Sequence, residues 1–94
     1  MKFDKYGRAP LTYSVLKIAG IEKGDILYVS ATGNAVYLSD EISYGETALG
    51  TVRVDDKARV CLPKQIRSRF EGLEYIAEGK YKYGKIELHF DVKN

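Results

Sequence analysis

Hydrophobic and polar residues alternate along short stretches of the chain, which is the pattern of half-buried β-strands. The predicted strands fall into two pairs, which are Ile26–Ser30 with Ala35–Leu38, and Tyr75–Ala77 with Lys85–Phe90. The first pair is joined by Ala31–Asn34, whose glycine and asparagine favour a hairpin turn. The second pair is joined across Gly79–Gly84. The pattern therefore predicts two β-hairpins, one in each half of the chain.

A short helix is expected before each hairpin. The first runs from Thr12 or Tyr13 to Ala19, with Thr12 as its N-cap and Gly20 as its C-terminal stop. The second begins at Pro63, a residue that suits the first helical turn, and continues to about Phe70. The two helices thus occupy matching places in the two halves.

An Asp-x-x-x-Arg motif precedes each helix and indicates an internal repeat. The motif spans Asp4–Arg8 and Asp55–Arg59, 51 residues apart. A short strand is expected before each motif, and another after it, at Arg8–Leu11 and Arg59–Leu62. The order of elements repeats although few residues are identical. We therefore predict one domain over residues 1–94, built from a first copy (1–39), a polar linker (40–50) and a second copy (51–94).

Composition agrees with a folded β-rich domain, and the charge is unevenly distributed. The chain has eight tyrosines and no tryptophan, and tyrosine favours strands. The net charge is only +2. Residues 1–47 hold five basic and six acidic residues (5 − 6 = −1), whereas residues 48–94 hold ten and seven (10 − 7 = +3). Thr51–Phe70 alone holds six basic residues and two acidic ones, which predicts a basic surface patch.

Other features narrow the location and chemistry of the protein. No apolar run is long enough to cross a membrane, the first residues are too polar for a signal peptide, and the single cysteine forms no internal disulfide. We therefore expect a cytoplasmic protein. Cys61 is expected to be a buried apolar residue, and His89 a strand-face residue. No catalytic motif is present, so we expect no enzyme, cofactor or metal.

Two stretches resemble a known family. Gly20-Ile21-Glu22-Lys23-Gly24-Asp25-Ile26-Leu27-Tyr28-Val29 resembles the helix-to-strand turn of AbrB-type domains. Val52–Arg67 resembles the strand, turn, strand and proline-led helix of the same family, and two such units in one chain resemble MraZ. The resemblance implies a mostly β fold with two short helices, a double-psi or swapped-hairpin barrel made of two tandem pseudo-repeats. The chain departs from the family pattern at Ala58, at Glu71–Glu74 and in the first helix, where Lys17 is the only basic residue.

The same resemblance implies a DNA-binding transcriptional regulator whose partner is double-stranded DNA and which assembles as a homo-oligomer. Lysine and arginine around the turns would displace counterions from phosphates, and arginine can also read guanine in the major groove. The expected DNA-binding residues are Arg53, Lys57, Arg59, Lys64, Arg67 and Arg69 from the second copy, with Lys5 and Arg8 from the first.

Simpler roles remain open for these residues. Arg8 and Arg59 could be structural partners of the aspartates in their turns. The basic residues of the second helix could form an ordinary solvated surface, which leaves Arg53 and Lys57 as the clearest contact residues. The tyrosines and lysines of Tyr75–Lys85 suggest base stacking less than they suggest a two-faced strand.

Other function classes also remain open. A MazE-type antitoxin would carry a long acidic tail after the last strand, where only Asp91–Asn94 follow here. A protein-assembly module that does not bind DNA is the other alternative, favoured by the nearly neutral first half.

Overall fold

The computed structural model describes residues 1–41, 48–80 and 84–92. Within these residues it contains two short helices and seven strands, in an order that repeats along the chain. The elements are β1 (Arg8–Pro10), α1 (Tyr13–Ala19), β2 (Ile26–Thr32), β3 (Ala35–Ser39), β4 (Gly50–Arg53), β5 (Arg59–Cys61), α2 (Lys64–Phe70), β6 (Tyr75–Lys80) and β7 (Lys85–Phe90). The prediction of a mostly β protein with two short helices is therefore confirmed.

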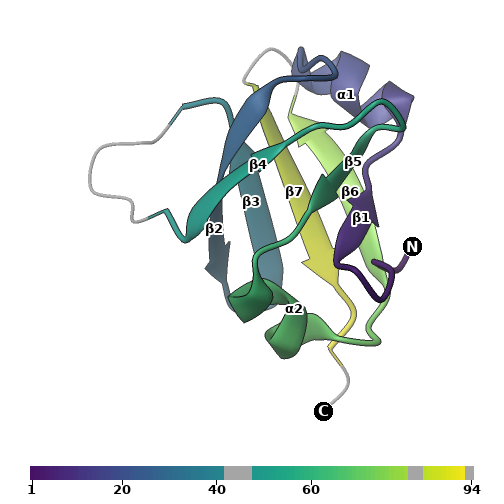
Figure 1. Ribbon diagram of the computed structural model, residues 1–94, viewed down its shortest axis with the longest axis vertical. Coiled ribbons are helices and arrows are strands. Elements are labelled where there is room, and N and C mark those ends of the chain that lie inside the picture. The colour runs from purple at the N-terminus through teal and green to yellow at the C-terminus, as the bar shows by residue number, and fades with distance from the viewer. Residues whose placement is uncertain (42–47, 81–83, 93–94) are drawn as a thin grey trace.

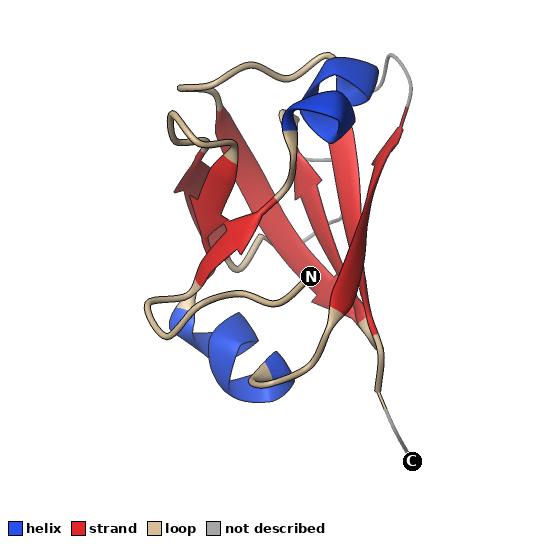
Figure 2. Ribbon diagram, turned by 90° about the vertical axis from the view of Figure 1, so that its right-hand side faces the viewer, coloured by secondary structure: helices blue, strands red, loops and turns tan. Residues whose placement is uncertain are grey.

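The strands form two antiparallel sheets (Figures 1 and 2). A five-stranded sheet has the order β4-β2-β3-β7-β6, and β1 pairs with β5 in a two-stranded ribbon. Ala9 and Val60 of the ribbon point into the core, where they are fully buried. The ribbon therefore has one face on the core and one face outward. The helices lie at opposite ends of the molecule, with α1 at the top and α2 at the bottom of Figure 1.

Strand pairing relates the two halves by an approximate twofold axis. In the ribbon, Arg8 lies opposite Cys61, and the residues 51 positions away from them, Arg59 and Pro10, also lie opposite each other. Ala9 and Val60 form the central pair. In the larger sheet β3 and β7 pair in the same antiparallel way. Residues that are 51 apart around the ribbon therefore have equivalent positions on the two sides of this axis.

Each helix packs against the hairpin of the other half. Helix α1 covers β6 so closely that a Cβ added at Gly79 would lie 2.6 Å from the Val15 carbonyl oxygen. Helix α2 reaches the hairpin of the first half, since the Arg69 guanidinium donates to the Gly33 carbonyl at 2.8 Å. The two halves are therefore interlocked rather than placed side by side.

The core lies between the ribbon and the inner face of the large sheet. Leu27 and Val29 from β2 and Ile86 and Leu88 from β7 are fully buried there. An aromatic cluster closes the α2 end, with the rings of Phe70 and Phe90 stacked at 4.3 Å and Tyr75 and Phe3 against Phe90. Alternation of buried and exposed residues along the strands produces this layered core.

The helix bounds agree with the sequence, and so do both caps of the first helix. The Thr12 side chain accepts a hydrogen bond from the Val15 amide, and Gly20 takes the left-handed conformation that ends α1. The prediction of a strand before Asp4 is wrong, because the residues ahead of the first turn form no strand. Among them Met1 exchanges backbone hydrogen bonds with Tyr75.

The end of the expected linker differs from the prediction as well. Gly50 begins β4, which pairs with β2, while residues 42–47 of that linker and the tyrosines at 81 and 83 lie outside the described residues. Among the described residues, no helix has the length and apolarity to cross a membrane.

Candidate nucleic-acid interface

The two Asp-x-x-x-Arg motifs fold into matching turns at opposite ends of the ribbon. In the first, Oδ1 of Asp4 accepts hydrogen bonds from the amides of Tyr6 and Arg8, both at 2.9 Å, and Oδ2 pairs with Nε of Arg8 at 2.6 Å. In the second, Asp55 makes the same three contacts, with an Oδ2 to Arg59 Nε distance of 2.8 Å. The same residues at the same spacing thus produce the same geometry twice.

The pKa of both aspartates is lowered by these contacts. Partial desolvation would raise the pKa of Asp4, but hydrogen bonds from the backbone and guanidinium of Arg8 and from the Tyr6 amide outweigh it. Asp55 has a lowered pKa for the same balance of reasons, with Arg59 and Lys57 as its donors. Both carboxylates therefore stay ionised to a lower pH in the folded chain than in the unfolded one.

The lowered pKa values predict loss of stability in acid. A depressed carboxyl pKa stabilises the fold above the unfolded value, about 3.9, and this contribution disappears as the pH falls through the folded value. We expect the urea midpoint to fall below about pH 4, and the Asp4→Asn/Asp55→Asn variant to start lower and lose less on acidification. Asp56→Asn, in the same turn, is the control. A double variant with the wild-type acid dependence would contradict the assignment.

Arg8 and Arg59 project from the outer face of the ribbon. They alternate with the buried Ala9 and Val60, and the register places them diagonally across the strand pair. The guanidinium of Arg8 lies 4.9 Å from the centre of the exposed Tyr6 ring. The side chains of Arg8 and Arg59 are 40% and 25% exposed, and each is held by its ion pair with the aspartate of its turn.

At the second turn, further cations lie on the strand side of the turn. Arg53, Lys57 and Arg59 line one shallow depression together with Lys23 and Gly24. The Gly24 turn is held there by the backbone, because its amide donates to the Val54 carbonyl at 2.7 Å and the Val54 amide donates to Asp25. Arg53 and Lys57 are exposed, and Arg53 also donates to the Gly24 carbonyl at 3.3 Å.

At the first turn, the further cations lie on the helix side. Lys5, Lys64 and Arg67 line a depression between the turn and α2. Arg67 crosses the turn so closely that a Cβ added at Gly7 would lie 2.1 Å from its Cδ, and its Nη1 donates to the Tyr6 carbonyl at 3.3 Å. Its Nε is buried and has no hydrogen-bond partner among the described residues. The turn therefore fixes the direction in which this guanidinium points.

The prediction that the basic residues of Thr51–Phe70 form a single surface patch is wrong. Because each helix packs at the turn of the other half, the basic residues of the second copy divide between the two ends of the ribbon. Seven of the eight expected residues lie at or beside the two turns, namely Lys5, Arg8, Arg53, Lys57, Arg59, Lys64 and Arg67. Arg69 lies apart from them, because it turns toward Gly33 of the β2–β3 hairpin.

The expectation of a buried Cys61 is also wrong. Strand residues alternate between faces, and Val60 occupies the buried face, so Cys61 is exposed on the outer face of the ribbon. Its thiol lies 3.4 Å from the Tyr6 carbonyl oxygen. Sequence patterns also did not indicate that the Tyr6 ring would lie against the cations of Lys5 and Arg8.

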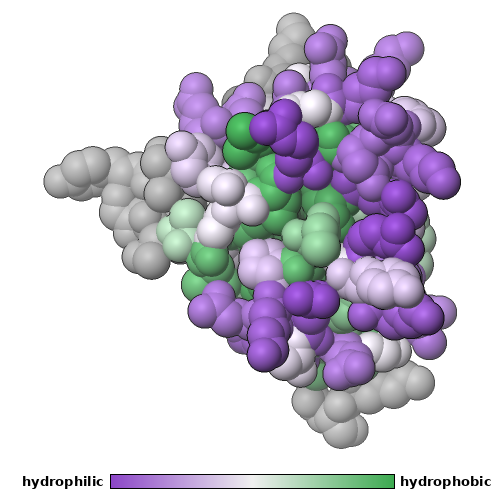
Figure 3. Space-filling view, in the orientation of Figure 1, coloured by the Kyte–Doolittle hydropathy of each residue, from purple (hydrophilic) through white to green (hydrophobic). Residues whose placement is uncertain are grey.

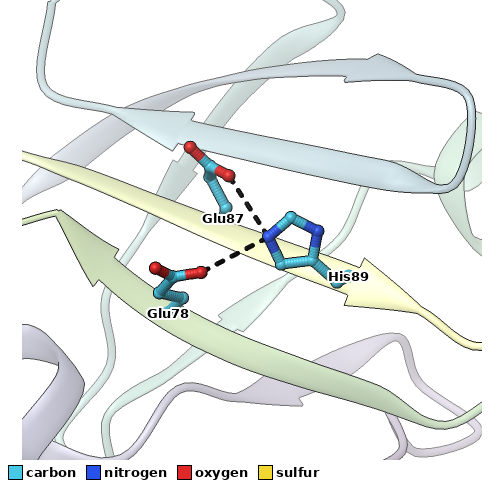
Figure 4. Close-up of side chains that lie close together, drawn as sticks. All are labelled: Glu78, Glu87 and His89. Atoms are coloured by element: carbon cyan, nitrogen blue, oxygen red, sulfur yellow. Dashed lines mark ion pairs between the residues drawn. The ribbon is translucent and has the colours of Figure 1, made fainter.

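A second charged cluster lies on the opposite face, on the outside of the large sheet (Figure 4). Glu78 and Glu87 are cross-strand neighbours, and Nε2 of His89 lies 3.6 Å and 3.2 Å from them. Lys80 pairs with the other oxygens of both carboxylates, and its hydrogen bond to Glu78 raises the pKa of the ammonium against the opposing effect of desolvation. His89 is thus a strand-face residue, as predicted, within a set of ion pairs.

Hydrophilic side chains cover the top, right-hand and lower parts of the molecule in Figure 3, which include both helix ends of Figure 1, and surround a hydrophobic area near the centre of the view. Comparison of the chain with protein-family models finds no match, and comparisons with curated proteins and with solved structures find none either. The two turns and the charges around them are therefore the features of this chain that bear on its function.

Proposed function

We propose that this protein is a DNA-binding transcriptional regulator of the AbrB/MraZ kind, which grips duplex DNA with the outer face of the β1–β5 ribbon. The observation that carries the proposal is the pair of Asp–Arg turns. They present Arg8 and Arg59 on one surface in equivalent positions about a twofold axis. Duplex DNA itself has local twofold symmetry in its backbone, so a twofold-related pair of cations suits it.

The finer fold assignment is part of this proposal. We assign the chain a swapped-hairpin, AbrB-like architecture in which two half-units interlock. The support comes from the antiparallel pairing of β1 with β5 and of β3 with β7, and from the packing of α1 on the hairpin of the other half. The family resemblance implies that two units interleave, and here both units belong to one chain.

The chemistry of the surface suits phosphate contacts. Each arginine is held in place by its aspartate and is partly exposed, so little side-chain entropy is lost when its guanidinium meets an anion. Lys57 and Arg53 at one end, and Lys5 and Lys64 at the other, add cations beside these fixed points. Contacts of this kind release counterions from the duplex and make the affinity depend strongly on salt.

A salt titration tests the proposal. Wild-type protein should bind a short duplex at low salt, with log K falling linearly as log salt rises. In an Arg53→Ala/Lys57→Ala/Arg59→Ala variant the slope should shrink by about 2.7, because each phosphate contact contributes roughly 0.9. Circular dichroism checks the fold of the variant, since Arg59 also pairs with Asp55. Absence of wild-type binding at low salt would contradict the proposal.

Assembly into a homo-oligomer is a separate part of the proposal. It would multiply contacts that are individually weak. Light scattering of the free protein should give a mass above that of one chain, and the mass of one chain would contradict it.

A further inference from the structure

The two ends of the ribbon are equivalent in backbone geometry but not in side chains. The matched residues are the pairs Asp4 with Asp55 and Arg8 with Arg59, which make the same contacts at both ends. Around them, residues 51 apart differ in charge. Lys64 and Arg67 of α2 correspond to Tyr13 and Leu16 of α1, and Lys57 of the second turn corresponds to Tyr6 of the first.

The largest of these differences lies on the helix side of the two turns. At the first turn Lys5, Lys64 and Arg67 line the depression against α2, together with Asp4 and Glu71. The equivalent depression at the second turn is lined by Tyr13 and Leu16, by Lys17 and Lys23, and by Glu22 and Asp56. There the Tyr13 hydroxyl donates to the Asp56 carbonyl, and Leu16 is buried. Basic residues therefore exceed acidic ones in this depression at the first turn (3 − 2 = +1) but not at the second (2 − 2 = 0).

The strand side differs less between the two ends, because Arg53 corresponds to Lys2, which is also an exposed cation. At the second turn Arg53 and Lys57 lie exposed beside Gly24. At the first turn the residue equivalent to Lys57 is Tyr6, whose ring lies under the cations of Lys5 and Arg8 at 5.1 Å and 4.9 Å. An aromatic ring at this place offers a stacking or van der Waals surface rather than a phosphate contact.

We propose that this chain binds a non-palindromic duplex in one fixed orientation, with Lys64 and Arg67 adding phosphate contacts between turn and helix at the α2 end and Lys57 adding one between turn and strand at the α1 end. This inference rests on the proposed DNA-binding function and adds the class of DNA site that the protein recognises. A homodimer has two identical halves and favours a palindrome. The stretch of DNA that one chain contacts is free of that constraint even within a homo-oligomer, because the chain carries both halves itself, and its two ends differ at several charged positions.

Tethered cleavage tests the orientation directly. Ser14 and Gln65 are both exposed, are 51 residues apart, and lie on α1 and α2. Ser14→Cys and Gln65→Cys, each in a Cys61→Ser background, would carry an iron chelate that cuts nearby DNA. The probe is the duplex that wild-type protein enriches most strongly from a random library. We expect a non-palindromic consensus, with each variant cutting at one end and the two variants at opposite ends.

The possible results separate this inference from the proposed function. Identical cleavage patterns from the two variants, or a palindromic consensus cut equally at both ends, would overturn the fixed orientation while DNA binding stands. Salt-dependent binding without any enriched sequence would also overturn it. Failure of wild-type protein to bind any duplex at low salt would instead overturn the proposed function.

A gain-of-function variant gives an independent check. Tyr13→Lys introduces at the α1 end the cation that Lys64 supplies at the α2 end. We expect it to raise the salt slope by about 0.9 and to make the cleavage pattern more symmetric. Lys64→Ala should lower the slope by the same amount. Equal effects of Lys64→Ala and Tyr13→Ala on the slope would contradict the unequal ends.

Discussion

Truncation of Phe90 is expected to cost about 3–5 kcal/mol of unfolding free energy, the range for a buried aromatic ring replaced by alanine. Phe90 is almost fully buried, and its ring contacts those of Phe3, Phe70 and Tyr75. Its backbone also bonds to Asn34, so the ring joins β7, α2, β6 and the first hairpin at one point. The total free energy of unfolding of such a domain is roughly 5–15 kcal/mol, so Phe90→Ala should be largely unfolded at modest urea concentrations.

The matched control is Ile76→Ala, on the neighbouring strand β6. Ile76 is the most exposed of the large apolar residues described, at 73%, so its truncation should change the unfolding free energy by less than about 0.5 kcal/mol. Urea denaturation followed by far-ultraviolet circular dichroism gives both values. A Phe90→Ala variant within about 1 kcal/mol of wild type would show that the aromatic cluster does not hold the α2 end together.

Substitution of Gly7 by alanine is expected to cost about 2–3 kcal/mol, by two separate effects. Gly7 has a φ of +81°, in the left-handed region where a Cβ is strained by roughly 1–2 kcal/mol. The added Cβ would also meet the side chain of Arg67, which would have to leave the turn. Because Arg67 belongs to the candidate interface, DNA affinity should fall along with stability.

Gly33→Ala separates the two effects. Gly33 also has a positive φ, +56°, but nothing lies within 4 Å of the position its Cβ would take. This variant should therefore show the backbone strain alone and keep DNA affinity at the wild-type level. Urea denaturation and duplex titration of both variants provide the comparison. Equal losses of stability in the two variants would mean that the clash of the added Cβ with Arg67 does not lower the stability of Gly7→Ala.

Local signals in the sequence were sufficient to predict the helices and hairpins. Thr12 and Gly20 cap α1 as expected, and β7 has the predicted bounds of Lys85–Phe90. The spacing of 51 between the two Asp-x-x-x-Arg motifs also recurs between the helices, which run over Tyr13–Ala19 and Lys64–Phe70. These features depend on residues close together in the chain, which is why the sequence reveals them.

The arrangement of the candidate interface depends on long-range pairing, which the sequence pattern does not reveal. Lys64 and Arg67 follow Arg59 closely in the chain, yet they lie beside Lys5 because α2 packs at the turn of the other half. The exposure of Cys61 follows from the pairing of β1 with β5, which buries Val60. Residues adjacent in the sequence therefore separate, and residues about sixty positions apart meet.

The most direct test of the DNA-binding surface compares two pairs of lysine and arginine residues on opposite faces. Arg53→Ala/Lys57→Ala removes two exposed cations from the second turn, and Lys80→Ala/Lys85→Ala removes two from the outer face of the large sheet. Both variants lose two positive charges. At 0.1 M ionic strength salt screens the attraction between charges more than about 10 Å apart, so only cations close to the phosphates should affect the affinity.

The measurement is the slope of log K against log salt for a short duplex. The first variant should lower the magnitude of the wild-type slope by about 1.8, which corresponds to two phosphate contacts, and the second should leave the slope unchanged. Equal slopes for the two variants would contradict the placement of DNA on the outer face of the β1–β5 ribbon.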